Sequence, residues 1–350
     1  MRLKMPALRA LIRALDGIPP DPADWLAVIE IANRSWLTPA VFLALERSGA
    51  LPGQPGEIRD YLGFIHGRNR QRNLRLRAQL IEAIGALNRA GIRPVALKGA
   101  GILLLVPDAD IGARMMSDLD LLVADAEKPV ADAALGALGY QASQDLHGLW
   151  RSADAGVLEL HCLNDALEAY GAAVFAAARC CSVERDRIQA WLPSPTFRAV
   201  HLIMHDQIKE GDYWRGSIDL RHLRDLAALA EEIDWSMLKA SLSAAGWWNA
   251  AETQLLTLHD LFGVEVPAEL TGRLTPRLQH WRRMAQIRHP VLAAPLRLAG
   301  ATAWLARRIR LGDGPSFTLA DFAPRIARKL LQGRRRTIEA LMGVHLGPKL

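Results

Sequence analysis

The chain has 350 residues, half of them hydrophobic, and a formal net charge of +6. A chain of this length and composition can bury a substantial core divided between two or three domains, which excludes a largely disordered protein. Its three cysteines are Cys162, Cys180 and Cys181, and their spacing supports neither a disulfide framework nor a CxxC metal site. We therefore expect reduced thiols.

Neither a secretory signal nor a membrane span is expected from the apolar segments. The basic stretch over residues 1–25 is broken by prolines and lacks the continuous apolar centre of a secretory signal. The most apolar later stretch, residues 291–306, contains Pro295 and Arg297 and falls short of the roughly 20 residues that cross a bilayer. These features favour a cytoplasmic protein.

Charge is divided unevenly along the chain. Residues 271–350 carry a net charge of +13, which leaves −7 for residues 1–270. A basic segment of this kind predicts a surface for an anionic partner such as nucleic acid, lipid headgroups or a phosphorylated acceptor. The alternative is a solvated helical face without a partner.

The periodicity of apolar residues predicts helices at both ends of the chain and an α/β core between them. Apolar residues recur at helical spacing around Trp25, and a helical run over residues 71–90 ends at Gly91. Short apolar runs then alternate with helical stretches, before helical spacing returns. The predicted segments are an N-terminal helical region (1–90), an α/β core (91–195), a helical domain (196–270) and a basic helical segment (271–350). The expected fold class is α+β with a mixed sheet.

The first strand of this core is predicted to lead into a glycine-rich turn. Residues 95–97 read as a strand, Lys98-Gly99-Ala100-Gly101 as the turn, and residues 102–105 as the start of a helix. Glycine permits close approach of the backbone, and the free N–H groups of a helix N-terminus favour an anion such as the phosphates of a nucleotide. Lys98 and Arg114 would add positive charge. The motif is neither a Walker loop nor a dinucleotide-binding fingerprint.

Two carboxylates begin the next predicted strand. An Asp-x-Asp pair is weak evidence by itself, and Asp108 with Asp110 forms another such pair without a strand pattern. Asp118 and Asp120, however, alternate with leucines in a strand-like run that extends to Val123. Side chains two residues apart on a strand share a face, so both carboxylates point toward one site. Two carboxylates together with a triphosphate suit the octahedral shells of two Mg²⁺ ions, with Mn²⁺ as a substitute.

These residues resemble the uncharacterised nucleotidyltransferases of the DNA polymerase beta-like superfamily. That family shows a Leu-Lys-Gly turn, an arginine and an Asp-(Ile/Leu)-Asp-Leu-Leu-Val strand, which here are residues 97–99, Arg114 and residues 118–123. The resemblance implies that the turn holds nucleotide phosphates, that the paired acids bind magnesium and that a third acid comes from a later strand. This chain departs from the usual Gly-Ser or Gly-Gly turn.

The resemblance also supplies the third acid. Residues 157–161 look like the later strand, with Glu159 and His161 on one face. Glu159 is then the third metal ligand beside Asp118 and Asp120. His161 is expected to contact these ligands or the substrate. The predicted nucleotide-binding residues are Lys98, Gly99, Ala100, Gly101, Arg114, Ser117 and His161.

Histidines and charged residues recur in the helical domain. His201 and His205 lie one helical turn apart, but Leu202 replaces the glutamate of a zinc-protease motif and no third ligand is evident. Hydrogen bonding in the core or between domains is therefore favoured over zinc. Asp225 is expected to form a solvated ion pair with Arg221 or Arg224, the alternative being a place in the acceptor cleft.

The predicted reaction is in-line attack by an acceptor hydroxyl or phosphate on the α-phosphorus of a nucleoside triphosphate, with pyrophosphate leaving. Members of the resembling family occur beside peptide-maturation enzymes. This favours a peptide, a phosphorylated peptide or a protein as the acceptor, with an RNA end or a small metabolite also open. Two alternatives remain: a non-catalytic module that binds a nucleotide or an anionic partner, and a toxin-type enzyme that modifies transfer RNA or protein.

Overall fold

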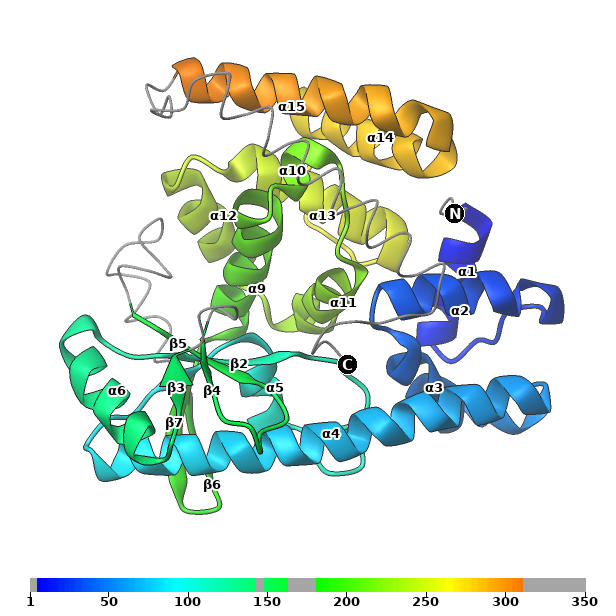
Figure 1. The fold of residues 1–350 in the computed structure, drawn as a ribbon. Coiled ribbons are helices and arrows are strands. Elements are labelled where there is room, and N and C mark those ends of the chain that lie inside the picture. The colour runs from blue at the N-terminus through cyan, green and yellow to red at the C-terminus, as the bar shows by residue number, and fades with distance from the viewer. Residues whose placement is uncertain (1–4, 143–147, 163–180, 311–350) are drawn as a thin grey trace. The chain divides into compact units, whose positions relative to one another are not determined.

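The computed structural model describes residues 5–142, 148–162 and 181–310 (Figure 1). The contacts within the chain divide it into two compact units, Met1–Ala294 and Pro295–Leu350. All the features described below belong to the first unit, except the helix α15 (Ala293–Arg310), most of which lies in the second. The basic cluster Arg334-Arg335-Arg336 lies outside the described residues.

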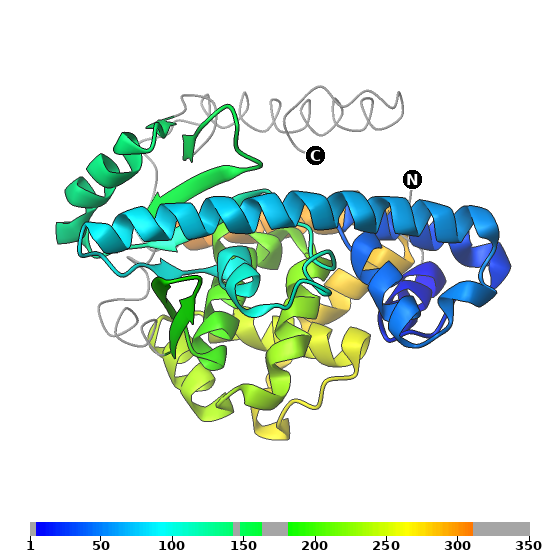
Figure 2. The same cartoon turned by 90° about the horizontal axis from the view of Figure 1, so that it is seen from below.

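Four helices form the N-terminal region. They are α1 (Met5–Leu15), α2 (Trp25–Arg34), α3 (Thr38–Arg47) and α4 (Gly56–Arg89). With 34 residues, α4 is about 50 Å long. It runs from the N-terminal helices along the whole sheet (Figure 2) and contacts α3, α5 and α6. The helix ends before Gly91, whose φ of 79° is in the region that favours glycine, as the sequence predicts.

Seven strands of the described chain form one mixed sheet in the order β3-β4-β5-β2-β1-β7-β6. They are β1 (Val95–Ala96), β2 (Asp118–Leu122), β3 (Gln141–Ala142), β4 (Leu149–Trp150), β5 (Val157–His161), β6 (Cys181–Arg185) and β7 (Ile188–Leu192). The two pairs β2 with β5 and β1 with β7 are parallel, and the other neighbours are antiparallel. The predicted α+β class with a mixed sheet is confirmed.

Helices pack against this sheet and enclose one hydrophobic core. They are α5 (Lys98–Leu105), α6 (Lys128–Ala137) and the C-terminal half of α4. The apolar residues of β2, including Leu119 and Leu121, are fully buried in this core together with Leu158 of β5. One face of β2 and β5 is thus anchored by the hydrophobic effect, which leaves the other face for polar side chains.

A second core joins the N-terminal helices to the helical domain. It contains residues of α1, α2 and α3 together with residues between Ala199 and Met284. The helices of that domain are α9 (Pro195–Met204), α10 (Asp212–Arg215), α11 (Leu220–Leu229), α12 (Trp235–Ala244), α13 (Trp248–Phe262) and α14 (Leu274–Arg288). A π-helical turn, η4 (His205–Lys209), continues α9. The boundaries predicted from the sequence at residues 90, 195 and 270 stay a prediction.

Two arginines of the predicted basic segment lie inside this helical domain. Arg283 is fully buried and donates hydrogen bonds to the side chains of Gln207, Gln254 and Thr257. Arg282 donates to the backbone carbonyls of Tyr213 and Trp214. Both guanidinium groups therefore hold α14 in place and are not part of an exposed basic surface. In the described part of the chain, no helix combines the length and apolarity needed to cross a membrane.

Candidate functional site

The predicted acids meet on two neighbouring parallel strands. β2 and β5 pair so that Asp120 lies beside Glu159 and Asp118 beside Val157. Strand alternation places the two aspartates on one face of β2, and it places Glu159 and His161 on the same face of β5. One donor atom from each of Asp120, Glu159 and His161 lies within 4.8 Å of the others. The structure thus brings together residues that are about forty positions apart in the sequence.

Asp120 is the centre of this cluster. Its side chain is 1% exposed, and its Oδ1 lies 2.9 Å from Lys98 Nζ and 3.0 Å from His161 Nε2. Burial opposes ionisation of this carboxyl, but the hydrogen bond from His161 and the charge of Lys98 outweigh it and hold the pKa of Asp120 far below its usual value. Asp120 therefore remains an anion at physiological pH.

Glu159 is in a different electrostatic position. Burial and the charges of Asp120 and Asp118 raise its pKa. His161 Nε2 lies 3.5 Å from Glu159 Oε2. Carboxylates crowded in this way repel one another, and oxygen donors are those that Mg²⁺ prefers. Asp120 and Glu159 offer oxygen donors of this kind, and the third donor that lies with them is the imidazole nitrogen of His161. Magnesium bound by Asp118, Asp120 and Glu159 stays a prediction.

The predicted strand is β1, but residues 98–101 form the first turn of α5 and not a separate turn before it, so the predicted turn is wrong. Leu97, the residue before α5, donates its N–H to the Asp120 carbonyl at 3.0 Å, which fixes the start of α5 beside the acids. Lys98 has a φ of 43°, which is strained for a residue with a side chain and costs about 1–3 kcal/mol. This backbone strain accompanies the placement of the Lys98 ammonium group on Asp120.

The glycines of this turn serve packing within the protein. A Cβ atom at Gly99 would lie 3.0 Å from Arg114 Nη1 and from Met116 Sδ. At Gly101 it would lie 3.0 Å from the Ala96 carbonyl oxygen. Glycine therefore allows α5 to lie against β1 and against the segment that precedes β2. A role of the N–H groups in binding phosphate stays a prediction.

Arg114 and Asp225 form a buried ion pair that the sequence analysis missed. Arg114 Nε and Nη2 lie 2.9 and 2.8 Å from Asp225 Oδ2, and both side chains are nearly buried. Burial opposes the charge of Asp225, but Arg114 outweighs it and lowers the pKa of this carboxyl. The expected solvated pair of Asp225 with Arg221 or Arg224 is wrong, because the side chain reaches across to the segment before β2 instead.

Polar side chains of α4 hold this segment in place. Asn69 donates to the carbonyls of Gly112 and Arg114, and Asn73, one turn later, donates to those of Ile111 and Arg114. Arg72 donates to the carbonyl of Met116. Both asparagines are buried, so their amides satisfy carbonyls that would otherwise be unpaired. The predicted residue Ser117 follows directly, and its carbonyl packs against Gly156.

His201 of α9 is buried close enough to Lys98 and Asp120 for their charges to act on it. Burial lowers its pKa to about 3, and the charge of Lys98 acts in the same direction, while Asp120 opposes it. The imidazole is therefore neutral at physiological pH. The centroids of the His201 and His205 rings are 6.5 Å apart. A neutral histidine near Lys98 and Asp120 can accept or donate a hydrogen bond without adding charge.

Comparison with known proteins gives one match. Residues 21–263 match the model of a protein family described as uncharacterised nucleotidyltransferase. No curated protein and no solved structure matches the chain. The matched residues cover about two thirds of the chain and include β1, β2 and β5 with all the acids described above. The chain therefore belongs to this family of nucleotidyltransferases.

Proposed function

We propose that this protein transfers a nucleoside monophosphate from a nucleoside triphosphate, such as ATP, to an acceptor hydroxyl or phosphate group. The acceptor oxygen forms a bond to the α-phosphorus, the bond between that phosphorus and the β-phosphate oxygen breaks, and pyrophosphate leaves. The observation that supports this most is the register of β2 and β5, which sets Asp120 beside Glu159 with Lys98 on Asp120.

The residues that begin α5 are suited to the triphosphate. The first N–H groups of a helix lack intrahelical partners and favour an anion. Here they follow Leu97, whose N–H donates to the Asp120 carbonyl, so phosphates bound at these groups would lie close to the acids. Lys98 supplies positive charge at the same place. Charge stabilisation and orientation by such fixed groups account for most of the rate in phosphoryl and nucleotidyl transfer.

Asp118, Asp120 and Glu159 would hold Mg²⁺, as two ions, with Mn²⁺ as a substitute. When bound, these ions would neutralise charge on the reacting phosphate oxygens. The chain's own acids set the geometry, because hydrogen bonds between β2 and β5 fix their spacing. His161, 3.0 Å from Asp120, would orient that carboxylate, as a residue that contacts a metal ligand does.

The acceptor that we favour is a peptide, a phosphorylated peptide or a protein. This choice rests on the family resemblance, and RNA is the other candidate. Nucleotide transfer to transfer RNA or to a protein, as in toxin-type relatives, uses the same chemistry.

The decisive experiment asks which molecule becomes labelled. The pure protein is incubated with each α-labelled nucleoside triphosphate, with Mg²⁺ or Mn²⁺ and with cell extract separated into peptides, proteins and RNA. We expect labelling that depends on the divalent cation. The double variant Asp118→Asn with Asp120→Asn should abolish it. Asparagine keeps hydrogen-bond acceptors for Lys98 and His161, so the fold should persist.

The other aspartate pair provides a matched control. Asp108 is exposed and contacts the buried Arg77, and Asp110 contacts the exposed Arg47, so neither acid belongs to the cluster on β2 and β5. The double variant Asp108→Asn with Asp110→Asn should therefore label as the wild type does. Undiminished labelling in the Asp118/Asp120 variant would refute the proposed site. Nucleotide binding without labelling of any fraction would favour the non-catalytic module.

A further inference from the structure

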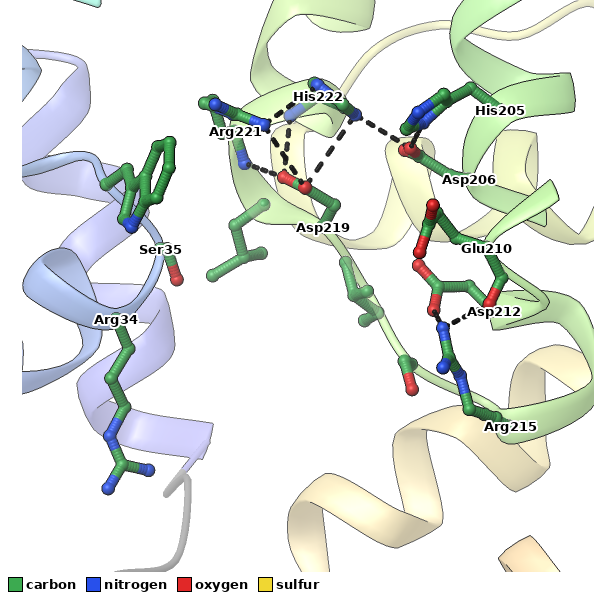
Figure 3. A pocket seen from close by; sticks show the side chains of 14 residues that line it. Arg34, Ser35, His205, Asp206, Glu210, Asp212, Arg215, Asp219, Arg221 and His222 are labelled. Carbon is green, nitrogen blue, oxygen red and sulfur yellow. Dashed lines mark hydrogen bonds and ion pairs between the residues drawn. The ribbon is translucent and has the colours of Figure 1, made fainter. Parts of the chain in front are cut away.

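A second cluster of metal-type ligands lies on the π-helical turn and α11. His205, Asp206 and His222 each offer one donor atom, and these atoms lie within 4.8 Å of one another. They form part of the wall of a cavity of about 500 Å³ in the first unit. Figure 3 shows the three side chains grouped together, with Asp219 beside His222 and with Glu210 and Asp212 beyond Asp206. None of these residues takes part in the function proposed above.

The distances within this cluster suit neighbouring positions in one coordination shell. Asp206 Oδ1 lies 3.1 Å from His205 Nδ1 and 2.7 Å from His222 Nδ1. Two ligand atoms that are each about 2.1 Å from a tetrahedral Zn²⁺ ion lie about 3.4 Å apart, so these hydrogen-bonded groups need to separate by less than about 1 Å to share one ion. Two histidines and one carboxylate are the protein ligands of several catalytic zinc sites, in which the fourth position is open to water or substrate.

An independent feature is the second oxygen of Asp206. This side chain is 2% exposed, and its Oδ2 is buried without a hydrogen-bond partner among the described residues. A buried carboxylate oxygen without a partner costs free energy unless a cation or a donor reaches it. The cavity has four acids, Asp206, Glu210, Asp212 and Asp219, against three arginines, Arg34, Arg215 and Arg221. The carboxyl groups of the cavity thus outnumber its guanidinium groups, which favours a cation.

The backbone explains how adjacent residues can serve one site. His205 and Asp206 are consecutive, and consecutive side chains on an α-helix point in clearly different directions. Here both belong to the π-helical turn η4, whose wider winding brings consecutive side chains closer in direction. π-helical turns interrupt α-helices rarely, and they occur often at functional sites. His222 reaches the same place from α11, whose first turn is capped by the Asp219 side chain.

We propose that His205, Asp206 and His222 bind one divalent transition-metal ion of the Zn²⁺ type, with its open positions toward the cavity. Imidazole nitrogen suits Zn²⁺, whereas Mg²⁺ prefers oxygen ligands only. The second cluster has two imidazole donors and one carboxylate, whereas the first has one imidazole and two carboxylates, so Zn²⁺ is favoured at the second. This site does not depend on the nucleotidyl-transfer proposal, because its ligands and its test are separate.

Arg221 links this site to the segment before β2. Its Nη2 lies 3.2 Å from His222 Nε2, and its Nη1 donates to the Met115 carbonyl at 3.3 Å. Because arginine is only a donor, His222 without metal carries its proton on Nδ1 and donates it to Asp206. When Nδ1 binds the metal, the proton moves to Nε2. Nε2 can then no longer accept a hydrogen bond from Arg221, so the Arg221 side chain must move away from His222. Arg221 thus competes with the metal.

The test measures metal binding on the full-length chain. Protein with the Asp118→Asn and Asp120→Asn changes is stripped with a chelator and titrated with Zn²⁺ and with Mg²⁺ in a calorimeter, so that the first site does not contribute. We expect one equivalent of Zn²⁺ and no Mg²⁺. His205→Gln with His222→Gln should abolish Zn²⁺ binding. The control is His259→Gln. His259 is exposed on α13, so this variant should bind Zn²⁺ as the unchanged protein does.

Two further variants keep the outcome clear if the double histidine variant fails to fold. Asp206→Asn retains an acceptor for both histidines but loses the charge, so Zn²⁺ affinity should fall by about 10–100-fold. Arg221→Gln removes the competing donor, and its carbonyl can accept from Nε2, so affinity should rise by up to about 10-fold. Absence of Zn²⁺ binding, or full retention in the Asp206→Asn protein, would show that the cluster is a hydrogen-bonded network only.

Discussion

At the scale of single residues, Asp120 determines how the other side chains of the site behave. Lys98 and His161 both contact Oδ1 of Asp120, and the Asp120 side chain is only 1% exposed. The charge of Asp120 raises the pKa of both Lys98 and Glu159, although burial acts in opposite directions on the two groups. A substitution at Asp120 therefore disturbs three neighbours, whereas one at Glu159 leaves the Lys98–Asp120 pair intact.

Replacement of Glu159 by glutamine should separate nucleotide binding from turnover. Glutamine keeps the size of the side chain but loses the charge that would fix a metal near the acceptor oxygen. We expect a fall in turnover of at least about 100-fold and nucleotide affinity within a few-fold of the wild type. Glu184→Gln on the edge strand β6 is the matched control. Wild-type turnover in Glu159→Gln would mean that the third acid is another residue.

His201 should make stability depend on pH. Its pKa is about 3 in the folded protein, because of burial and the charge of Lys98, and about 6.5 when unfolded. The unfolded chain therefore binds a proton more readily between these values, so stability is present above pH 6.5 and is lost as pH falls. Between pH 7 and pH 5 the wild type should lose about 2 kcal/mol more than His201→Gln. Urea unfolding at both pH values measures this, and equal losses would contradict it.

At the scale of elements, the segment before β2 is held from two sides. α4 supplies amide donors to its carbonyls, and α11 supplies Asp225 to its arginine. This segment connects the pair of acids on β2 to the helical domain. Its position therefore depends on contacts between elements that lie far apart in the sequence, and a change in α11 is expected to reach the acids through Arg114.

The Arg114–Asp225 pair should stabilise the fold only as a pair. Breaking a buried ion pair leaves an uncompensated charge, so Asp225→Leu should cost about 3–5 kcal/mol. Arg114→Met with Asp225→Leu removes both charges and should cost less than the single change, since replacing both partners by apolar groups is often neutral. The comparison uses the free energy of unfolding at pH 7, where Asp225 is ionised because Arg114 lowers its pKa. A double variant less stable than Asp225→Leu would contradict this.

Local pattern predicted the strands of the site but not their long-range contacts. β5 spans Val157–His161, as the alternation of apolar and polar residues predicts, and β2 begins at the predicted Asp118. Arg114 and Asp225 are 111 residues apart, and no spacing rule covers such a distance. The hairpin between β6 and β7 was missed because its turn residues, Asp186 and Arg187, adopt positive φ without the glycine that usually marks this turn. The polar face of α4 could have been predicted from Asn69 and Asn73, because these two amide side chains lie one helical turn apart in the sequence.

At the scale of the whole molecule, the fold is built around two hydrophobic cores. One core encloses the sheet, and the other joins the N-terminal helices to the helical domain, so residues at both ends of the matched family region share a core. Arg282 and Arg283 are buried in the helical domain, although they lie in the basic segment of the sequence. The net charge of residues 271–350 therefore overstates the charge that a partner can reach.

The other basic residues of this segment are densest at Arg334-Arg335-Arg336. A nucleoside triphosphate needs only the acids, Lys98 and the start of α5, so these arginines are expected to serve the acceptor or another anionic partner. If they contact phosphates, each contact releases counterions, and affinity should fall with salt by a log–log slope of roughly 0.7–0.9 per phosphate. The triple change of these arginines to alanine should weaken acceptor binding and flatten that slope, while nucleotide binding stays unchanged. The matched control changes three exposed arginines of α4, Arg59, Arg68 and Arg89, to alanine. An equal effect of both triple changes would assign the salt dependence to overall charge.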